Sequence, residues 1–340
     1  MLIRMLPLLG KTLAELQEVA LSVGLQKFAG KQLAEWLYVR RVTSFDEMTN
    51  ISLKGREALK ANYTIGRHAP VKEAVSIDGT RKYLFQIGEQ FVETVYIPEE
   101  DRTTLCVSTQ AGCKMGCKFC MTGTLGFHGN LSAAAILNQI FYFDDLSNLV
   151  FMGEGEPMDN LDNVLRALEI MTAPYGPAWS PKRITVSTVG VPAMKRFLDE
   201  SECHVAVSMH NPFAVERVQI MPAEKLFSIT EVVNLLKQYD FSHQRRVSFE
   251  YICWAGQNDT MRHAKELLRL LKGLNCRINL IRFHAGVEDI KNERRFPASD
   301  EKQMEFLRDY LTEHGLTTTI RRSRGEDILA ACGMLVNSLQ

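Results

Sequence analysis

The sequence predicts an α/β protein built as a full or partial βα barrel, preceded by a small helical domain and a linking β-hairpin. After residue 104, strand-like and helix-like segments alternate, whereas the first 62 residues show helical periodicity alone. Such alternation predicts a parallel sheet with helices outside it, and 340 residues suffice for a barrel with an accessory piece. We therefore expect three parts, at residues 1–72, 73–98 and 99–340.

The first part is predicted to consist of short amphipathic helices. Apolar residues repeat at helical spacing from Leu13 to Val23, around Trp36, and from Leu53 to Leu59. Residues 1–72 carry eleven Lys and Arg against six Asp and Glu, although the whole chain carries 40 of each. A basic module in a neutral chain is typical of a protein that binds a polyanion, and a solvated helical surface shows the same charges.

The second part is predicted from alternating apolar and polar residues, and the third part from alternating strand-like and helix-like segments. Tyr83, Phe85 and Ile87 share one face of a strand that follows the turn signal Asp78-Gly79, which indicates the hairpin. Barrel strands are expected at 105–109, 148–152, 184–188, 204–209, 247–253, 277–282 and 317–321. Helices are expected at 132–143, 161–173, 191–199, 229–238, 260–272 and 299–314. In a βα barrel the chemistry lies at the carboxyl ends of the strands, so the loops there should carry the site.

Composition narrows the class of protein. Hydrophobic residues make up 46% of the chain and charged residues 24%, which excludes a disordered or low-complexity chain. No run approaches the roughly 18 apolar residues that a membrane span needs, and the N-terminal segment lacks a cleavage site. We expect a cytoplasmic protein without membrane contact. Its eight cysteines should then be free for metal binding or catalysis.

Three of these cysteines, Cys113, Cys117 and Cys120, form a CxxxCxxC motif after the first predicted barrel strand. Thiolates bind iron–sulfur clusters or zinc, but a structural zinc site needs a fourth protein ligand, and His128 nearby has no partner. Three thiolates leave one iron of a [4Fe-4S] cluster open. The motif, with Phe119 before its last cysteine, resembles that of the radical SAM enzymes, in which S-adenosylmethionine (SAM) takes this open position.

A turn after the second predicted barrel strand also indicates SAM binding. In Gly153-Glu154-Gly155-Glu156-Pro157, the glycines let the backbone approach a ligand and Glu156 can accept an ammonium group. Beside the cysteine motif, this turn resembles the site of the SAM amino group.

Larger segments resemble one family in particular. Residues 92–120, 151–157, 184–190 and 319–335, with 30–38 upstream, closely resemble the RlmN/Cfr family of radical SAM RNA adenine methyltransferases. The resemblance spans nearly the whole chain and includes Cys106 and Cys332, which an activase of another protein does not need. It implies a barrel of radical SAM type, one [4Fe-4S] cluster and two SAM molecules per turnover. It also makes residues 1–72 an RNA-docking domain.

The resemblance implies methylation of carbon 2 of adenine in 23S rRNA and in tRNA. Cys332 would accept a methyl group from one SAM, and a radical from a second SAM would remove hydrogen from it. The resulting carbon radical would add to the base, and Glu93 would accept the carbon 2 proton. Cys106 would release the product by forming a disulfide with Cys332. An electron donor such as flavodoxin or ferredoxin and a monomeric state complete this expectation.

The resemblance also implies a set of SAM contacts. These are Gly155, Glu156, Ser187, Ser208, Met209 and His210. One departure from the family concerns His284, which stands where the family places an Asn and can make a similar hydrogen bond. We expect His284 to contact SAM. Cys203, Cys253 and Cys276 match nothing in the family and are expected in the core.

Two alternatives stay open. Methylation at carbon 8, the Cfr-type activity, uses the same cysteines. Residues 321–327 resemble the carbon 2 branch, while 279–282 lean towards the other. A zinc-stabilised RNA-binding protein without catalysis would account for the basic helices and the cysteine loop, but it gives Cys332 and Glu156 no role.

Overall fold

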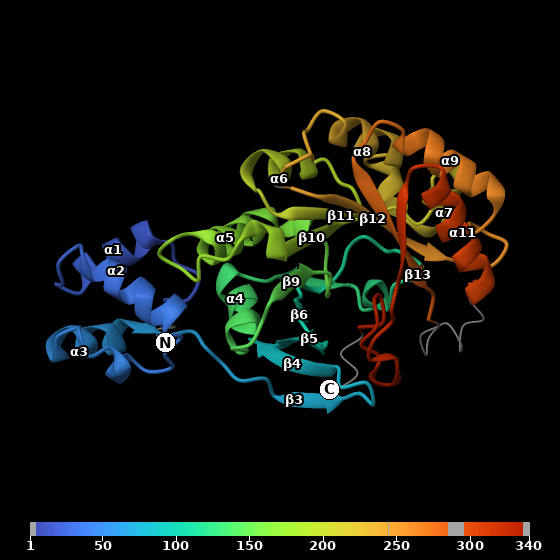
Figure 1. Ribbon diagram of the computed structural model, residues 1–340. Helices are drawn as coiled ribbons and strands as arrows, with labels where there is room; N and C mark the ends of the chain where they lie inside the picture. The colour runs from blue at the N-terminus through green and yellow to red at the C-terminus, as the bar shows by residue number, and fades with distance from the viewer. Residues whose placement is uncertain (1–4, 244, 285–295, 336–340) are drawn as a thin grey trace.

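The computed structural model describes residues 5–243, 245–284 and 296–335. Its centre is a ten-stranded sheet in the order β14-β13-β12-β11-β10-β9-β6-β5-β4-β3, with helices packed along its outer side (Figure 1). From β6 to β14 every neighbouring pair is parallel. In the described residues β14 and β3 are the two edges of this sheet, so the predicted barrel is a partial one.

The predicted barrel elements are present, with boundaries within three residues of those expected. The parallel strands are β6 (Thr103–Cys106), β9 (Asn148–Phe151), β10 (Ile184–Thr188), β11 (His204–Ser208), β12 (Val247–Cys253), β13 (Cys276–Arg282) and β14 (Thr317–Arg321). The helices are α4 (Ala133–Phe141), α5 (Leu161–Thr172), α6 (Met194–Glu200), α8 (Ile229–Leu236), α9 (Met261–Leu271) and α11 (Glu301–Glu313). The sequence did not predict α7 (Ala214–Ile220) or the small hairpin β7 (Gln110–Gly112) and β8 (Phe127–Asn130). Short 3₁₀ turns lie at Phe45–Glu47, Met121–Thr124, Pro157–Asn160, Pro181–Arg183, Pro222–Lys225 and Glu326–Ile328.

Alternate side chains of the barrel strands point into the hydrophobic core and into an internal cavity. In β10, Ile184 and Val186 are fully buried in the hydrophobic core, whereas Thr185 and Ser187 line a cavity on the concave side. Successive side chains of a strand point to opposite faces, so one strand serves both the core and the cavity. Helix α8 begins with a reciprocal capping box between Ser228 and Glu231, which satisfies two backbone donors at its start.

The predicted hairpin segment forms three antiparallel strands, β3 (Lys72–Val75), β4 (Arg81–Ile87) and β5 (Gln90–Pro98). Strand β5 also pairs with β6, so these strands continue the main sheet. In Figure 1 the C-terminal segment, residues 325–335, lies beside them. The hairpin itself is confirmed, while its role as a linker between domains stays a prediction.

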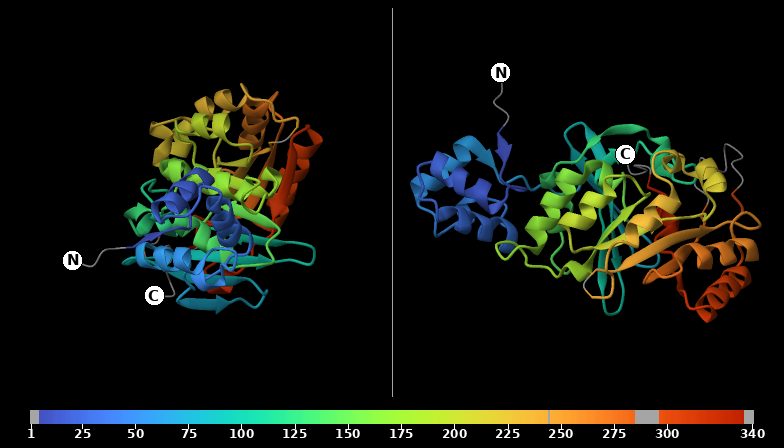
Figure 2. Two further views of the ribbon diagram at one scale, coloured as in Figure 1. Left: turned by 90° about the vertical axis from the view of Figure 1, so that its left-hand side faces the viewer. Right: turned by 90° about the horizontal axis from the view of Figure 1, so that it is seen from above.

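The N-terminal region holds the predicted helices at one end of the molecule, beyond α5 (Figure 2, right). Its elements are β1 (Leu6–Pro7), α1 (Leu13–Ser22), α2 (Ala29–Ala34), a π-helical turn (Glu35–Val39), α3 (Leu53–Asn62) and β2 (Tyr63–Thr64). Arg166 of α5 pairs with Glu15 at 2.6 Å, and Arg41 donates to the Phe143 carbonyl at 2.7 Å. Leu16 and Leu33 belong to the same core cluster as the barrel residues. Within the described residues, none of the helices has the length and apolar character that a membrane crossing requires.

Candidate active site

A cavity of about 770 Å³ lies inside the partial barrel, and its lining includes the residues that follow the carboxyl ends of several strands. Among its lining residues are most of those predicted from the sequence: Cys106, Cys113, Cys117, Cys120, Gly155, Glu156, Ser187, Ser208, His210, His284 and Cys332. Glu93 and Met209 are fully buried and do not line it. The fold therefore brings together residues that lie more than 200 positions apart in the sequence.

The loop carrying Cys113, Cys117 and Cys120 is held by backbone contacts. The Cys113 N–H donates to the Gly126 carbonyl at 2.9 Å, and the Lys118 N–H donates to the Ile220 carbonyl at 2.9 Å. Burial raises the pKa of the Cys113 thiol to about 12, and repulsion from Cys120 adds to this rise. Thiolates crowded in this way become favourable when a cationic centre binds them.

These thiols fit a cluster better than a single ion. Within the described residues, no three His, Cys, Asp or Glu side chains are placed to hold one metal ion. A [4Fe-4S] cluster takes one thiolate on each of several irons, so it needs thiols that are separated. The three cysteines of one loop all line the same cavity, which is the donor set that such a cluster needs.

Cys332 reaches the cavity because the C-terminal segment is bound to the residues that follow the cluster motif. The Gly333 carbonyl accepts from the Met121 N–H at 2.7 Å, and the Leu335 carbonyl accepts from the Thr122 hydroxyl at 2.9 Å. Cys332 is solvent-accessible and lines the cavity. It therefore lies beside the cluster loop, as a thiol that reacts there must.

Cys106 lies near Cys332. It ends strand β6 and packs against a small apolar cluster that contains Ala330. Burial raises the pKa of the Cys106 thiol to about 12, Cys332 adds to the rise, and the Arg321 guanidinium opposes it. Although the residue is accessible from the cavity, the protein around the Cys332 thiol removes it from bulk water and raises its pKa, and Arg321 again opposes the rise. Arg321, which was not predicted as a site residue, is thus the cation that acts on both thiols.

The Gly153–Pro157 turn places Glu156 on the cavity wall. Gly155 has φ 97°, and a Cβ there would lie 2.5 Å from the Gln110 Cβ, so both conformation and space require glycine. The Glu156 carboxylate accepts from the Met158 N–H at 3.1 Å and the Val189 N–H at 2.8 Å. Burial raises the pKa of Glu156 to about 7. Carboxylate oxygens keep further acceptor sites, so an ammonium group in the cavity would find a fixed partner.

His210 lies two residues after the end of strand β11 and adopts a left-handed conformation, with φ 55°. Its Nδ1 accepts from the Ile252 N–H at 3.1 Å, and its carbonyl accepts from the Asn258 amide at 2.6 Å. Burial lowers the pKa of His210 to about 3, so the ring is neutral. Phe119, of the cysteine motif, contacts the ring edge-to-face at 4.7 Å between centroids.

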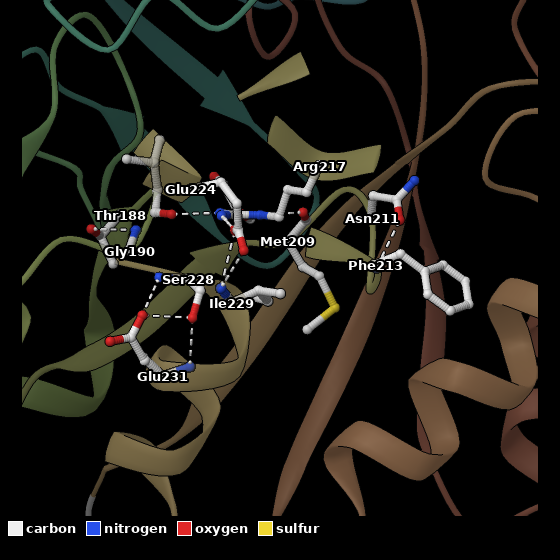
Figure 3. A network of polar contacts seen from close by, with 12 residues as sticks. Thr188, Gly190, Met209, Asn211, Phe213, Arg217, Glu224, Ser228, Ile229 and Glu231 are labelled. Carbon is white, nitrogen blue, oxygen red and sulfur yellow. Dashed lines mark hydrogen bonds and ion pairs between the residues drawn. The ribbon is translucent and has the colours of Figure 1, made fainter. Parts of the chain in front are cut away.

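A buried arginine, Arg217 of α7, holds the backbone of this wall (Figure 3). Its guanidinium donates to the carbonyls of Met209 at 2.9 Å, Ser208 at 2.9 Å and Val189 at 2.6 Å, and it pairs with Glu224. The ends of β10 and β11 are therefore tied to one side chain. Met209 presents no side chain to the cavity, so only its backbone could face a ligand. No motif in the sequence pointed to Arg217.

Glu93 lies in strand β5, in an environment without solvent. Its carboxylate is fully buried and pairs with the fully buried Lys82 ammonium at 3.0 Å. Lys82 also donates to the Leu329 carbonyl at 3.3 Å, and the Glu93 N–H donates to Glu154 at 2.8 Å. Burial raises the pKa of Glu154 to about 8, which makes Glu154 neutral beside the ion pair. Lys82 and Glu154 were both missed, although Glu154 belongs to the glycine-rich turn.

The remaining predicted residues have mixed outcomes. His284 lines the cavity, where its Nε2 lies 2.6 Å from the Ser323 hydroxyl and 3.3 Å from Glu326. Cys203 and Cys253 are buried in the core as expected. Cys276 is only half-buried and lines a second, smaller cavity.

Comparison with known proteins agrees with this arrangement. A family model described as the ribosomal RNA large subunit methyltransferase N-terminal domain matches residues 6–65, and the Radical SAM superfamily model matches residues 107–271. A "Probable dual-specificity RNA methyltransferase RlmN" of Bacteroides thetaiotaomicron is 59% identical over 339 residues, covering 98% of this chain and 97% of the relative. The "Dual-specificity RNA methyltransferase RlmN" of Geobacter sulfurreducens is 39% identical over 98% of this chain and 93% of the relative.

A solved structure is similar throughout. The crystal structure of a radical SAM methyltransferase from Sphaerobacter thermophilus superposes with a TM-score of 0.90 at 34% sequence identity. The superposed region covers 97% of this chain and 99% of the chain in the crystal structure. The helical N-terminal region and the partial barrel are thus shared as one arrangement.

Proposed function

The chain belongs to the RlmN family of radical SAM RNA methyltransferases, and we propose that it methylates carbon 2 of adenine in 23S rRNA and in tRNA. One observation carries the proposal. Two cysteines outside the cluster motif, Cys106 and Cys332, lie with the three motif cysteines around a single cavity. A radical SAM enzyme that needed only its cluster would have no use for this second pair of thiols.

The site residues divide into a cofactor set and a transfer set. Cys113, Cys117 and Cys120 would hold the [4Fe-4S] cluster, and Glu156, with the backbone around Ser208, would hold SAM. When bound, the cluster and SAM supply one-electron cleavage that starts radical chemistry. Arg217 keeps the strand ends that face SAM in place through their carbonyls. The chain's task here is to position these groups.

Cys332 and Cys106 form the transfer set. Cys332 carries the methyl carbon to the base, and the thiolate of Cys106 then attacks the Cys332 sulfur. This forms a disulfide and breaks the bond between that sulfur and the carbon, and the bonding electron pair stays with the base, whose new carbon takes up a proton to become the methyl group. Both thiols have raised pKa values, so Cys106 must lose its proton to a neighbouring group before it attacks. The positive charge of Arg321 lowers the pKa of both thiols and so stabilises either thiolate.

Glu93 acts as the acceptor of the carbon 2 proton in this proposal. Its carboxylate is buried against Lys82 and set back from the cavity wall. The same ammonium group contacts the Leu329 carbonyl, three residues before Cys332. A shift of the C-terminal segment when RNA binds would therefore act directly on the partner of Glu93.

RNA docking is assigned to the N-terminal region. Several of its cations are engaged by protein groups, as when Lys60 pairs with Asp46 at 2.6 Å. Lys27, Lys31 and Lys54 are exposed, and within the described residues no hydrogen bond or ion pair engages their side chains. Phe28, which is 65% exposed, lies beside Lys27 and offers a ring on which a base can stack.

We expect the triple variant Lys27→Gln/Lys31→Gln/Lys54→Gln to bind tRNA about tenfold more weakly and with a shallower salt dependence, because up to three phosphate contacts are lost. SAM cleavage without RNA should be unchanged. The control is Lys302→Gln with Lys265→Gln, which removes exposed charges from the barrel helices. Equal RNA affinity of the triple variant and the parent would refute the assignment.

The electron donor and the oligomeric state complete the proposal. A small reduced electron carrier such as flavodoxin or ferredoxin would supply the electron to the cluster. The enzyme is a monomer in this proposal.

The function is tested by mass spectrometry of RNA. Anaerobically reconstituted protein, SAM, reductant and unmodified rRNA fragments or tRNA are incubated, and the digested nucleosides are compared with synthetic 2-methyladenosine and 8-methyladenosine. We expect 2-methyladenosine. Formation of 8-methyladenosine would replace the proposal by the carbon 8 activity, and absence of both products with both RNAs would overturn it.

A further inference from the structure

A second cavity, of about 250 Å³, lies at the amino-terminal ends of β10 to β14, opposite the end where the cluster loop sits. Its lining contains four cationic side chains, Lys182, Arg245, Arg246 and Arg277. Among the described residues that line it, none is an Asp or Glu. The wall of this cavity is therefore strongly positive in a chain whose net charge is zero.

Few acceptors or acidic groups offset the charges of these four side chains. Within the described residues, no hydrogen bond or ion pair engages the side chains of Lys182, Arg246 and Arg277. Arg245 donates to the Leu198 carbonyl at 2.7 Å and lies 4.0 Å from the carboxylate of Glu202. Burial lowers the pKa of Arg277, and repulsion from Arg246 lowers it further. Like charges held this close are unfavourable unless an anion offsets them.

His204 adds a donor without a partner. It is 8% exposed, and its Nδ1 accepts from the Arg246 N–H at 2.9 Å, which leaves the ring proton on Nε2. The Nε2 atom is buried and has no hydrogen-bond partner within the described residues, as is true of Nε of Arg245. Leaving a buried donor unsatisfied costs about 1–3 kcal/mol, so an acceptor bound among these four cations would be favourable.

We propose that this cavity is a binding site for a phosphate group. A phosphate offers several acceptor oxygens and up to two negative charges, which match guanidinium forks, an ammonium group and an imidazole N–H. Lys182 and Arg246 lie exposed at the rim, Arg277 is half-buried, and His204 and Arg245 lie deeper. A phosphate entering from solvent would thus meet Lys182 and Arg246 first and the side chain of Arg277 behind them.

The phosphate could belong to a free phosphate compound or to the RNA backbone, and both present the same chemistry to the site. The main cavity also touches Lys182, His204, Arg246 and Arg277, so the two cavities share a wall inside the barrel. The ligand nevertheless binds at the end of the strands opposite Cys332. Its binding does not depend on the methylation reaction, so the two proposals can fail separately.

Isothermal titration calorimetry of the full-length protein with inorganic phosphate and with pyrophosphate, at constant ionic strength in KCl, tests the site. We expect saturable binding that Arg246→Gln/Arg277→Gln weakens at least tenfold. Lys182→Gln, which alters only an exposed rim residue, should weaken it about threefold and guards against misfolding of the double variant. The control Lys265→Gln, on the outer face of α9, should bind like the parent.

Competition by a short oligouridine distinguishes the two sources. Displacement of phosphate by the RNA, with RNA affinity lowered in the double variant, identifies the RNA backbone. Undisturbed phosphate binding identifies a free phosphate compound. If phosphate, pyrophosphate and RNA all bind the double variant and Lys265→Gln equally well, or none binds the parent, the site does not exist.

Discussion

The cluster loop, residues 113–120, and the C-terminal segment, residues 325–335, both bring cysteines to the cavity, but they are held in different ways. The cluster loop carries its three thiols within eight consecutive residues and is fixed mainly by backbone hydrogen bonds, such as Cys113 to Gly126. Its chemistry follows from spacing alone. Any fold that exposed this loop to a cavity would keep the three thiols together.

The C-terminal segment depends on partners far away in the sequence. Asp327 accepts from the Ser76 hydroxyl at 2.5 Å and the Ile77 N–H at 3.1 Å, and the Gly325 N–H donates to Asp78 at 3.0 Å. Leu329 adopts a left-handed conformation, with φ 53°, whose cost such contacts must offset. The comparison teaches that cofactor binding is encoded locally, whereas the placement of the transfer thiol is encoded by the fold.

The largest effect should come from the cluster loop. Cys117→Ala removes one of three ligands, so the anaerobically reconstituted variant should lose the brown colour and the roughly four irons per chain expected of the parent. SAM cleavage and RNA methylation should both be abolished. Cys276→Ala, which removes a half-buried thiol elsewhere, is the control and should keep both. A colourless parent that holds one zinc would contradict the cluster assignment.

Substitutions of Cys332 and Cys106 should impair the transfer to RNA without impairing the cluster loop. Cys332→Ala should keep the iron and SAM cleavage but form neither methylated protein nor an RNA adduct, because the acceptor thiol is gone. Cys106→Ala should load Cys332 and then stall as a covalent protein–RNA species, because no second thiol attacks the Cys332 sulfur. A denaturing gel should show a shift, sensitive to ribonuclease, with Cys106→Ala alone. Turnover of Cys106→Ala at the parent rate would make Cys106 a packing residue.

Lys82 connects Glu93 with the C-terminal segment, so its removal should damage both stability and transfer. Lys82→Met leaves Glu93 buried without its cation and should lower the free energy of unfolding by about 3–5 kcal/mol. Lys82→Met/Glu93→Gln, which removes both charges, should recover most of this loss without recovering RNA methylation. Urea denaturation measures the first effect and nucleoside analysis the second. A double variant as unstable as Lys82→Met would show that the pair does not act through its charges.

The smallest effect should follow from loosening the segment at its surface. Asp327→Ala removes the acceptors for Ser76 and Ile77 and should slow RNA methylation about threefold to tenfold, because Cys332 is then less well positioned. SAM cleavage and iron content should stay at parent levels. Asp309→Ala, an exposed acid of α11, is the matched control. A rate equal to the parent would show that the other contacts of the segment, such as those of Met121 and Thr122, suffice to position Cys332.

The sequence by itself determined the secondary structure of the barrel and the chemistry of the cluster loop. Strand β10 and helix α9 lie where alternation and helical periodicity place them, because these patterns depend on neighbouring residues only. The CxxxCxxC spacing likewise predicts its ligand set without reference to the fold. The pairing of Cys106 with Cys332 was inferred from family resemblance rather than from any pattern in this chain.

Tertiary structure alone decided what surrounds those residues. Lys82 reaches Glu93 because β4 and β5 pair in one register, and Arg217 reaches three carbonyls because α7 packs beneath the ends of β10 and β11. The basic cavity gathers residues from the starts of five strands, β10 to β14. From a sequence alone, a charged side chain is predicted to be exposed to solvent. Its burial and its pairing depend on contacts between segments that are distant in the chain, and no local pattern of residues contains that information.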